Sequence, residues 1–139
     1  HVPMIYMLDT NICIDIIRRR SPKLLNRLVA CQIGDVGISS ITLAELAHGA
    51  EKSALRDQNL IALQQFILPL EVACFDQPAA LAYGKIRAVL KSNGNLIGSM
   101  DMLIAAHAVA LNSILVTNNE KEFRRVDGLT CENWLKPAG

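Results

Sequence analysis

Ile5-Tyr6-Met7-Leu8-Asp9-Thr10-Asn11 joins a short apolar run directly to an acidic, hydroxyl-bearing turn. Four consecutive apolar residues are typical of a strand that is buried on both faces of a sheet. Asp9 can cap a following helix, and Ile12, Ile16 and Ile17 continue at helical spacing. The stretch therefore predicts a strand, a tight turn and a helix, which is how a parallel crossover unit begins.

The same alternation of strand and helix continues along the chain. Helices are predicted after Ser21-Pro22, after a cap at Ser40 or Thr42, over 55–67, from 76 onward, and over 100–111 with Ser99 as its cap. Further strands are predicted at 36–39, 70–75 and 114–117, with an edge strand near 129–134 and a polar turn at Asn118-Asn119. We therefore expect an α/β protein with a mainly parallel sheet of four to five strands and helices on both faces.

Composition excludes several classes of protein. The chain has 139 residues, of which 51% are hydrophobic and 19% charged, so it is neither disordered nor too short to bury a core. We expect one domain over residues 4–135 and interpret His1-Val2-Pro3 as a cloning remnant. The formal charge of +1 provides no global basic field, so a nucleic-acid partner must be held by local patches or by a metal.

The cellular setting is predicted from two further features. No apolar run reaches the roughly 18 residues that a membrane helix needs, and no signal sequence is visible, so we expect a cytoplasmic protein. The four cysteines form no C-x-x-C pair, which argues against a zinc or redox motif. We interpret them as small buried hydrophobic residues in a reducing compartment.

Acidic residues occur where a parallel sheet places its ligand site. Ligands bind beyond the carboxyl ends of the strands, and Asp9 and Glu45 follow the first two predicted strands. Asp101 lies in the first turn of the helix before the fourth strand, and Glu122 follows that strand closely. Each acid alone can simply cap a helix or face its dipole. Together, several carboxylates in one place repel one another unless a hard cation such as Mg²⁺ or Mn²⁺ lies between them.

Four segments, in order, resemble the motifs of PIN-domain proteins of the VapC toxin branch. They span Met4 to Trp134 and together are highly specific. The segments are Met7-Leu8-Asp9-Thr10-Asn11-Ile12, then Ile38 to Leu46 with Gly49, then Gly94, Ile97-Gly98 and Asp101 to Ala108, and finally Leu115 to Asn119 with Glu122-Phe123, Val126, Gly128-Leu129 and Glu132-Asn133-Trp134.

The resemblance implies a three-layer α/β/α sandwich and an endoribonuclease toxin that depends on Mg²⁺ or Mn²⁺. Such toxins cut tRNA or other structured RNA, are neutralised by a VapB antitoxin, and form homodimers and larger toxin–antitoxin assemblies. By position, Asp9, Glu45 and Asp101 match the metal-binding acids, and Glu122 is the expected fourth catalytic acid. Thr10, Asn11, Thr117 and Asn119 are expected to contact metal-bound water or phosphate, although each can also serve only as a cap or turn residue.

Other features have two interpretations. His107 is expected to be a packed histidine rather than a catalytic one. The basic residues of 18–27 can grip an RNA backbone or form a solvated face, and the pair Arg124-Arg125 has the same two interpretations. Several apolar residues can line an antitoxin groove or belong to the core, namely Leu24, Leu28, Ile61 and Leu63 to Phe66.

Two other functions compete with the nuclease. An inactive PIN-like scaffold would only bind RNA or a protein, but the retained acids Asp9, Glu45 and Asp101 speak against it. A phosphoacceptor domain would have paired acids after the first strand and a lysine after the last. Here the first strand is followed by Asp-Thr-Asn, and the nearest late lysine is Lys121.

Overall fold

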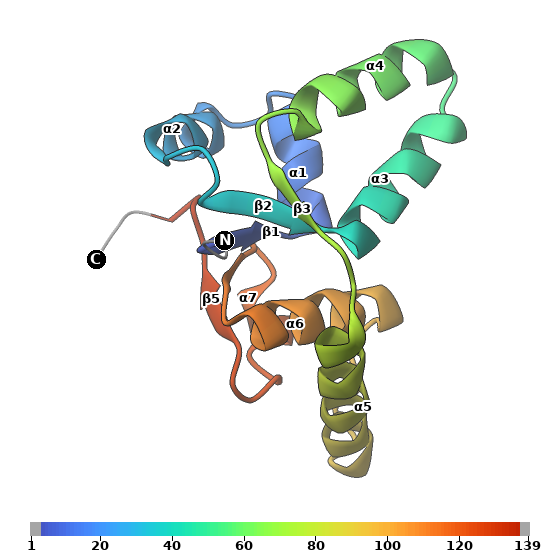
Figure 1. The fold of residues 1–139 in the computed structure, drawn as a ribbon, viewed down its shortest axis with the longest axis vertical. Coiled ribbons are helices and arrows are strands. Elements are labelled where there is room, and N and C mark those ends of the chain that lie inside the picture. The colour runs from blue at the N-terminus through green and yellow to red at the C-terminus, as the bar shows by residue number, and fades with distance from the viewer. Residues whose placement is uncertain (1–3, 137–139) are drawn as a thin grey trace.

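The structure is a computed structural model that describes residues 4–136. Within them, five strands and seven helices alternate along the chain (Figure 1). The proposed cloning remnant His1-Val2-Pro3 lies outside the described residues.

The strands form one parallel sheet in the order β3-β2-β1-β4-β5. The first strand, β1, lies at the centre. On one side of it lie β2 and then β3, and on the other side lie β4 and then β5. The carboxyl ends of β1, β2 and β4 therefore lie side by side, where a doubly wound sheet opens a ligand crevice. The strand bounds are β1 Tyr6–Leu8, β2 Val36–Ser39, β3 Glu71–Ala73, β4 Ile114–Val116 and β5 Thr130–Glu132.

Helices cover both faces of the sheet, which confirms the three-layer α/β/α arrangement (Figure 1). One layer contains α1 Thr10–Ile17, α2 Pro22–Ala30, α3 Ser40–Glu51 and α4 Arg56–Ile67. The other contains α5 Gln77–Ser92, α6 Ser99–Leu111 and the short α7 Glu120–Phe123.

Neighbouring residues of a strand belong to two separate hydrophobic cores, one on each face of the sheet. Leu8 and Val116 pack with the layer of α1 to α4, whereas Met7 and Leu115 pack with the layer of α5 to α7. All four side chains are fully buried. Because side chains alternate across a strand, a sheet covered on both faces needs continuous apolar runs, as the sequence pattern predicted.

The structure corrects three local predictions. The cap of α3 is Ser39, whose hydroxyl accepts from Ile41 N, and not Ser40 or Thr42. Gly98 caps α6, and Ser99 is the first helical residue. The polar turn after β4 continues into α7, because Phe123 is anchored in the core. In each case tertiary packing moves a helix boundary by one to three residues or adds one turn, which propensity alone does not determine.

The cysteines and the membrane prediction can be checked directly. All four cysteines are free; Cys13 is buried, as expected, but Cys74 is exposed, which corrects the prediction that all are buried. Within residues 4–136, no helix is both long and apolar enough to cross a membrane.

Gly37 leaves no room for a side chain between β2 and β3. A Cβ atom there would lie 2.6 Å from Cε of Met4 and 2.9 Å from Cβ of Glu71. We expect Gly37→Val to lower the free energy of unfolding by about 3 kcal/mol, because the strands would have to separate. Gly84→Ala on α5 is the control, since a Cβ there meets no atom within 4 Å. It should raise stability by about 0.5 kcal/mol or more in the same urea titration, and an equal loss for both variants would contradict the packing argument.

Candidate active site: an acidic cluster at the carboxyl edge of the sheet

Asp9 lies directly after β1 and is almost fully buried, with 4% of its surface exposed. Its Oδ1 caps α1 by accepting from Ile12 N at 2.8 Å, and the Thr117 side chain also hydrogen-bonds to it. Burial raises the pKa of Asp9, and the charges of Asp15 and Glu45 raise it further, while the hydrogen bonds lower it. Asp9 is thus a helix cap and also a charge held away from water.

Glu45 is brought to the same edge by α3, which follows β2. Its Oε1 accepts a hydrogen bond of 2.6 Å from the Thr10 hydroxyl at the start of α1. Thr10 also lies 3.3 Å from the buried hydroxyl of Thr42, one turn before Glu45 on α3. These contacts join residues more than 30 positions apart and fix one oxygen of the Glu45 carboxylate.

Asp101 lies in the first turn of α6 and is partly exposed. Its pKa is raised to about 6, mostly by burial and then by the negative charges of Glu122, Asp9 and Glu45, in that order. Four carboxylates that are distant in sequence therefore act on one another at this edge. We call Asp9, Glu45, Asp101 and Glu122 the acidic cluster.

Glu122 is held at the rim of the cluster by two donors. Its Oε2 accepts from Asn119 Nδ2 at 2.8 Å, and its Oε1 accepts from Gly98 N at 3.2 Å. These hydrogen bonds lower its pKa. Thr117 Oγ1 in turn accepts from Asn119 N at 2.9 Å. Asn119 therefore contacts the fourth acid directly, and Glu122 also ties α7 to the N-terminal end of α6.

The chemistry of the cluster fits a divalent cation. Within the described part of the chain, no three His, Cys, Asp or Glu side chains already stand together as a metal-binding group. Glu45 and Glu122 are instead each held by neutral donors, Thr10 and Asn119. Burial is the largest cause of the raised pKa of Asp101, and the charges of Glu122, Asp9 and Glu45 add a repulsion that a cation would relieve. All the ligand atoms are oxygens, which hard cations prefer.

Thr42 and Gly98 were not recognised as site residues from the sequence. Thr42 was considered only as a cap, although its spacing of three residues from Glu45 places both on one side of α3. Gly98 contributes through its backbone N–H, for which no side-chain signal exists. Asn11 is exposed at the start of α1, beside Thr10.

His107 is a packed residue, as predicted. It is fully buried on α6, its Nδ1 lies 2.7 Å from Ser39 Oγ, and its ring meets Phe75 edge to face at 5.3 Å. Burial lowers its pKa. It therefore joins α6 to the residue that caps α3.

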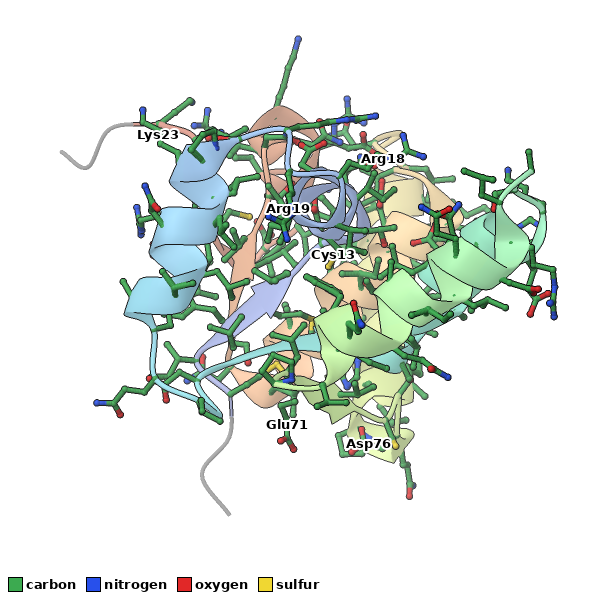
Figure 2. All side chains as sticks on the ribbon, turned by 90° about the horizontal axis from the view of Figure 1, so that it is seen from above. Cys13, Arg18, Arg19, Lys23, Glu71 and Asp76 are labelled. Atoms are coloured by element: carbon green, nitrogen blue, oxygen red, sulfur yellow. The ribbon has the colours of Figure 1, made fainter. Side chains whose placement is uncertain are left out.

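The basic residues of 18–27 fall into two groups, those engaged in contacts within the protein and those that are not. Arg20 pairs with Asp15 at 3.2 Å, and Arg27 pairs with Glu132 at 2.9 Å. Arg27 also lies over the Trp134 ring at 5.2 Å, and Lys23 donates to a backbone carbonyl near the C-terminal end of the described chain. Three of the five basic residues of the run therefore help to hold α1 and α2 in place. Arg18 and Arg19 lie at the end of α1, where their side chains lead to different sides (Figure 2).

The later pair is engaged in the same way. Arg124 lies 3.6 Å from Glu120, and Arg125 donates to Leu96 O at 3.3 Å. Arg124 therefore contacts α7, and Arg125 contacts the loop that precedes α6, both at the protein surface.

The parallel three-layer fold and its similarity to known ribonucleases define the class of this protein as a nuclease. The chain belongs to the PIN-domain family, whose model matches residues 6–129, and within it to the VapC ribonucleases.

Three relatives illustrate the relationship. Ribonuclease VapC2 of Rickettsia felis is 45% identical over 96% of this chain and 100% of its own length. The tRNA(fMet)-specific endonuclease VapC of Shigella flexneri is 43% identical over 93% of this chain and 97% of its own. The crystal structure of DNA-bound VapBC from Salmonella typhimurium contains a chain that is 41% identical, with a TM-score of 0.90 over 94% of this chain and 98% of that one.

Proposed function

We propose that this protein is an endoribonuclease toxin that hydrolyses RNA phosphodiester bonds at the acidic cluster. The observation that carries the proposal is Asp101, a partly buried carboxyl whose pKa is raised first by burial and then by the charges of Glu122, Asp9 and Glu45. Maintaining such repulsion costs stability, and a site that binds a cation and a phosphate gives a reason for it. The VapC relatives support the same reaction class.

Each acid has a proposed role. Asp9 and Asp101 hold the cation, Glu45 binds it directly or through water and can accept a proton, and Glu122 completes the cluster as the fourth catalytic acid. Thr10 orients Glu45, and Asn119 orients Glu122. Asn11 is proposed to contact phosphate or ordered water. The Thr117 hydroxyl, which was expected to do the same, is fully buried and bonded to Asp9 and Asn119 N, so its proposed role is to position these two residues. We propose Mg²⁺ or Mn²⁺ as the cation, which when bound neutralises phosphate charge and lowers the pKa of a bound water.

The proposed substrate is tRNA or another structured RNA, and the proposed inhibitor is a VapB-type antitoxin, as the relatives suggest. We also propose that residues 4–135 form one domain, that the toxin is a homodimer which assembles further with antitoxin, and that it acts in the cytoplasm.

A groove of about 690 Å³ between α1, α2 and α4 supports the antitoxin proposal. Its wall is largely apolar and includes Leu25, Leu28, Val29 and Phe66, which suits an amphipathic partner helix. Leu28 and Phe66 were expected to line such a groove. Of the other expected lining residues, Leu24 and Leu63 belong to the core and Ile61 is exposed away from the groove.

The test is cleavage of total tRNA by the toxin after its antitoxin has been removed, with Mg²⁺, Mn²⁺ or EDTA. We expect cleavage at defined positions with either cation and none with EDTA. The absence of cleavage with both cations, in a preparation that melts cooperatively, would contradict the proposal. An inactive scaffold would instead bind RNA with unchanged affinity after Asp101→Ala and never cleave it.

The hydroxyl of Thr10 provides a second test. We expect Thr10→Val to lower kcat about tenfold, because Glu45 loses the donor that orients it. Thr10→Ser keeps the hydroxyl and should keep most of the activity. Equal losses for Val and Ser would show that the methyl group and its packing matter, and not the hydrogen bond.

A further inference from the structure

A second cleft leads away from the acidic cluster between α1, α3 and α4. Its volume is about 690 Å³, and Thr10 and Glu45 of the acidic cluster's edge lie on its wall. The cleft is therefore continuous with the site at which the scissile phosphate would bind. It is distinct from the apolar groove beside α2, although the two share Ile17 and Ala62.

The wall beyond Glu45 is basic. Arg18 just after α1, His48 on α3 and Lys52 just after α3 line the cleft, whereas Glu45 is the one acid among its lining residues. Within residues 4–136, Arg18 and Lys52 form no ion pair, in contrast to Arg20 and Arg27 of the basic run. Two exposed cations are thus available to a ligand.

Along one side of α3, the side chains change from acidic at Glu45 to basic at Lys52. Glu45, His48 and Lys52 follow at intervals of three and four residues, so they lie along one side of the helix. At 1.5 Å per residue, Lys52 lies about 10 Å from Glu45 along the axis. A negatively charged ligand strand that extends from the acidic cluster along α3 would therefore reach Lys52 at the C-terminal end of that helix.

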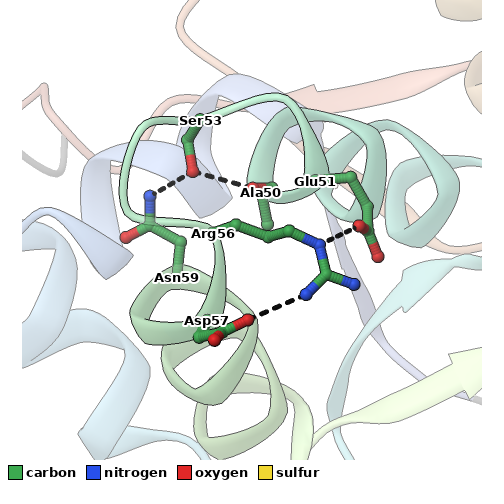
Figure 3. Close-up of polar contacts among 6 residues, drawn as sticks. All are labelled: Ala50, Glu51, Ser53, Arg56, Asp57 and Asn59. Atoms are coloured by element: carbon green, nitrogen blue, oxygen red, sulfur yellow. Dashed lines mark hydrogen bonds and ion pairs between the residues drawn. The ribbon is translucent and has the colours of Figure 1, made fainter.

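The far wall of the cleft is held by contacts within the α3–α4 connection (Figure 3). Ser53 Oγ donates to Ala50 O at 2.7 Å, and Asn59 Nδ2 donates to Ser53 Oγ at 2.9 Å. Arg56 is paired with both Glu51 and Asp57, at 2.6 and 2.8 Å. The nearby arginine is therefore neutralised by its own neighbours, which leaves Lys52 as the unpaired cation of this connection.

We propose that this basic cleft binds the RNA strand that flanks the scissile phosphate, with Arg18 and Lys52 contacting its phosphates. The inference rests on the proposed nuclease function and specifies where the substrate backbone runs. Unpaired cations beside a groove are the usual means of holding a single strand. An RNA strand is favoured over a peptide here because two unpaired cations, Arg18 and Lys52, line this cleft, whereas Arg19 is the one charged residue among the described residues that line the groove beside α2.

The experiment compares two double variants in an Asp101→Asn background, so that RNA can bind without being cut. The probe is a short fluorescein-labelled single-stranded RNA of mixed sequence, titrated at several KCl concentrations with Mg²⁺ present. Arg18→Gln with Lys52→Gln removes the two cleft cations. Arg19→Gln with Lys91→Gln is the matched control, because Arg19 lines the other groove and Lys91 lies in the last turn of α5.

We expect the cleft variant to weaken RNA binding about tenfold or more and to reduce the slope of log K against log salt by about 1.4, or about 0.7 per phosphate contact. The control should leave both unchanged, and Arg18→Lys with Lys52→Arg should restore binding, since only the charge is needed. An unchanged salt slope, or equal losses in both double variants, would overturn the proposal. Retained RNA binding with lost antitoxin binding would show that the cleft holds a protein instead.

Failure of the cleft proposal is distinguishable from failure of the nuclease proposal. With Asp101 intact, the original protein and the Arg19→Gln with Lys91→Gln control should cleave a long RNA equally, whereas the cleft variant should cleave it more slowly at limiting RNA. Equal cleavage by the cleft variant and the control would overturn the cleft proposal alone. If the original protein does not cleave the RNA with Mg²⁺ or Mn²⁺, the nuclease proposal itself is wrong.

Discussion

Asp9→Asn is expected to reduce RNA cleavage by at least about a hundredfold, since a bound cation supplies several kcal/mol of transition-state stabilisation. The same change should leave the metal-free fold equally stable or more stable. Asn caps helices as well as Asp does, so the bond from Ile12 N persists, and a buried charge with a raised pKa is removed. Cleavage rates and urea unfolding in EDTA measure the two effects separately.

The matched control is Asp76→Asn. Asp76 caps α5 as Asp9 caps α1, accepting from Ala79 N at 3.2 Å, but it lies outside the acidic cluster. This control should retain full cleavage. If Asp9→Asn also retained it, Asp9 would be a cap and nothing more, and the proposed metal site would lose its first ligand.

The second large effect is expected in the pH dependence of stability. The free energy of unfolding should change with pH in opposite directions with and without Mg²⁺. The pKa of Asp101 rises from 3.8 to about 6 on folding. A carboxyl whose pKa is raised in the fold favours folding below its unfolded pKa, and that contribution is lost as pH rises through about 6. In EDTA, Asp101 should therefore destabilise the protein progressively between about pH 4 and about pH 6, by about 1 kcal/mol above this range, given its partial exposure.

Mg²⁺ should reverse this trend, because only the ionised carboxylates bind it. The rise in melting temperature on adding Mg²⁺ should be small at pH 5 and should grow as pH increases through about 6. His107 acts in the opposite direction in EDTA, since its lowered pKa makes folding more favourable as pH rises.

A comparison with Asp101→Asn isolates the contribution of Asp101. In EDTA, the excess stability of the variant over the original protein should increase with pH, and the Mg²⁺ effect should nearly vanish in the variant. A constant difference across this pH range would show that Asp101 titrates as an ordinary surface carboxyl.

Much of this architecture follows from local sequence patterns. Met7 and Leu8 at the end of the first apolar run are fully buried on opposite faces of the sheet, and such a strand requires helical crossovers. The same patterns placed Asp9 and Glu45 after strands and Asp101 at a helix start. Features that depend on distant contacts could not be predicted in this way. The helix α7 forms because Phe123 packs into a core made by distant residues, and helix propensity does not encode that contact.

The sequence by itself determined the layered fold and the order of the acids along it, since apolar periodicity and turn residues act over a few positions. Only the tertiary structure decided which donors hold those acids and which cations remain unpaired. Thr10 meets Glu45 from 35 residues away, and Arg27 is paired while Arg18 of the same run opens into a cleft. Such partnerships depend on how whole helices pack against the sheet, and packing joins residues whose separation along the chain carries no local signal.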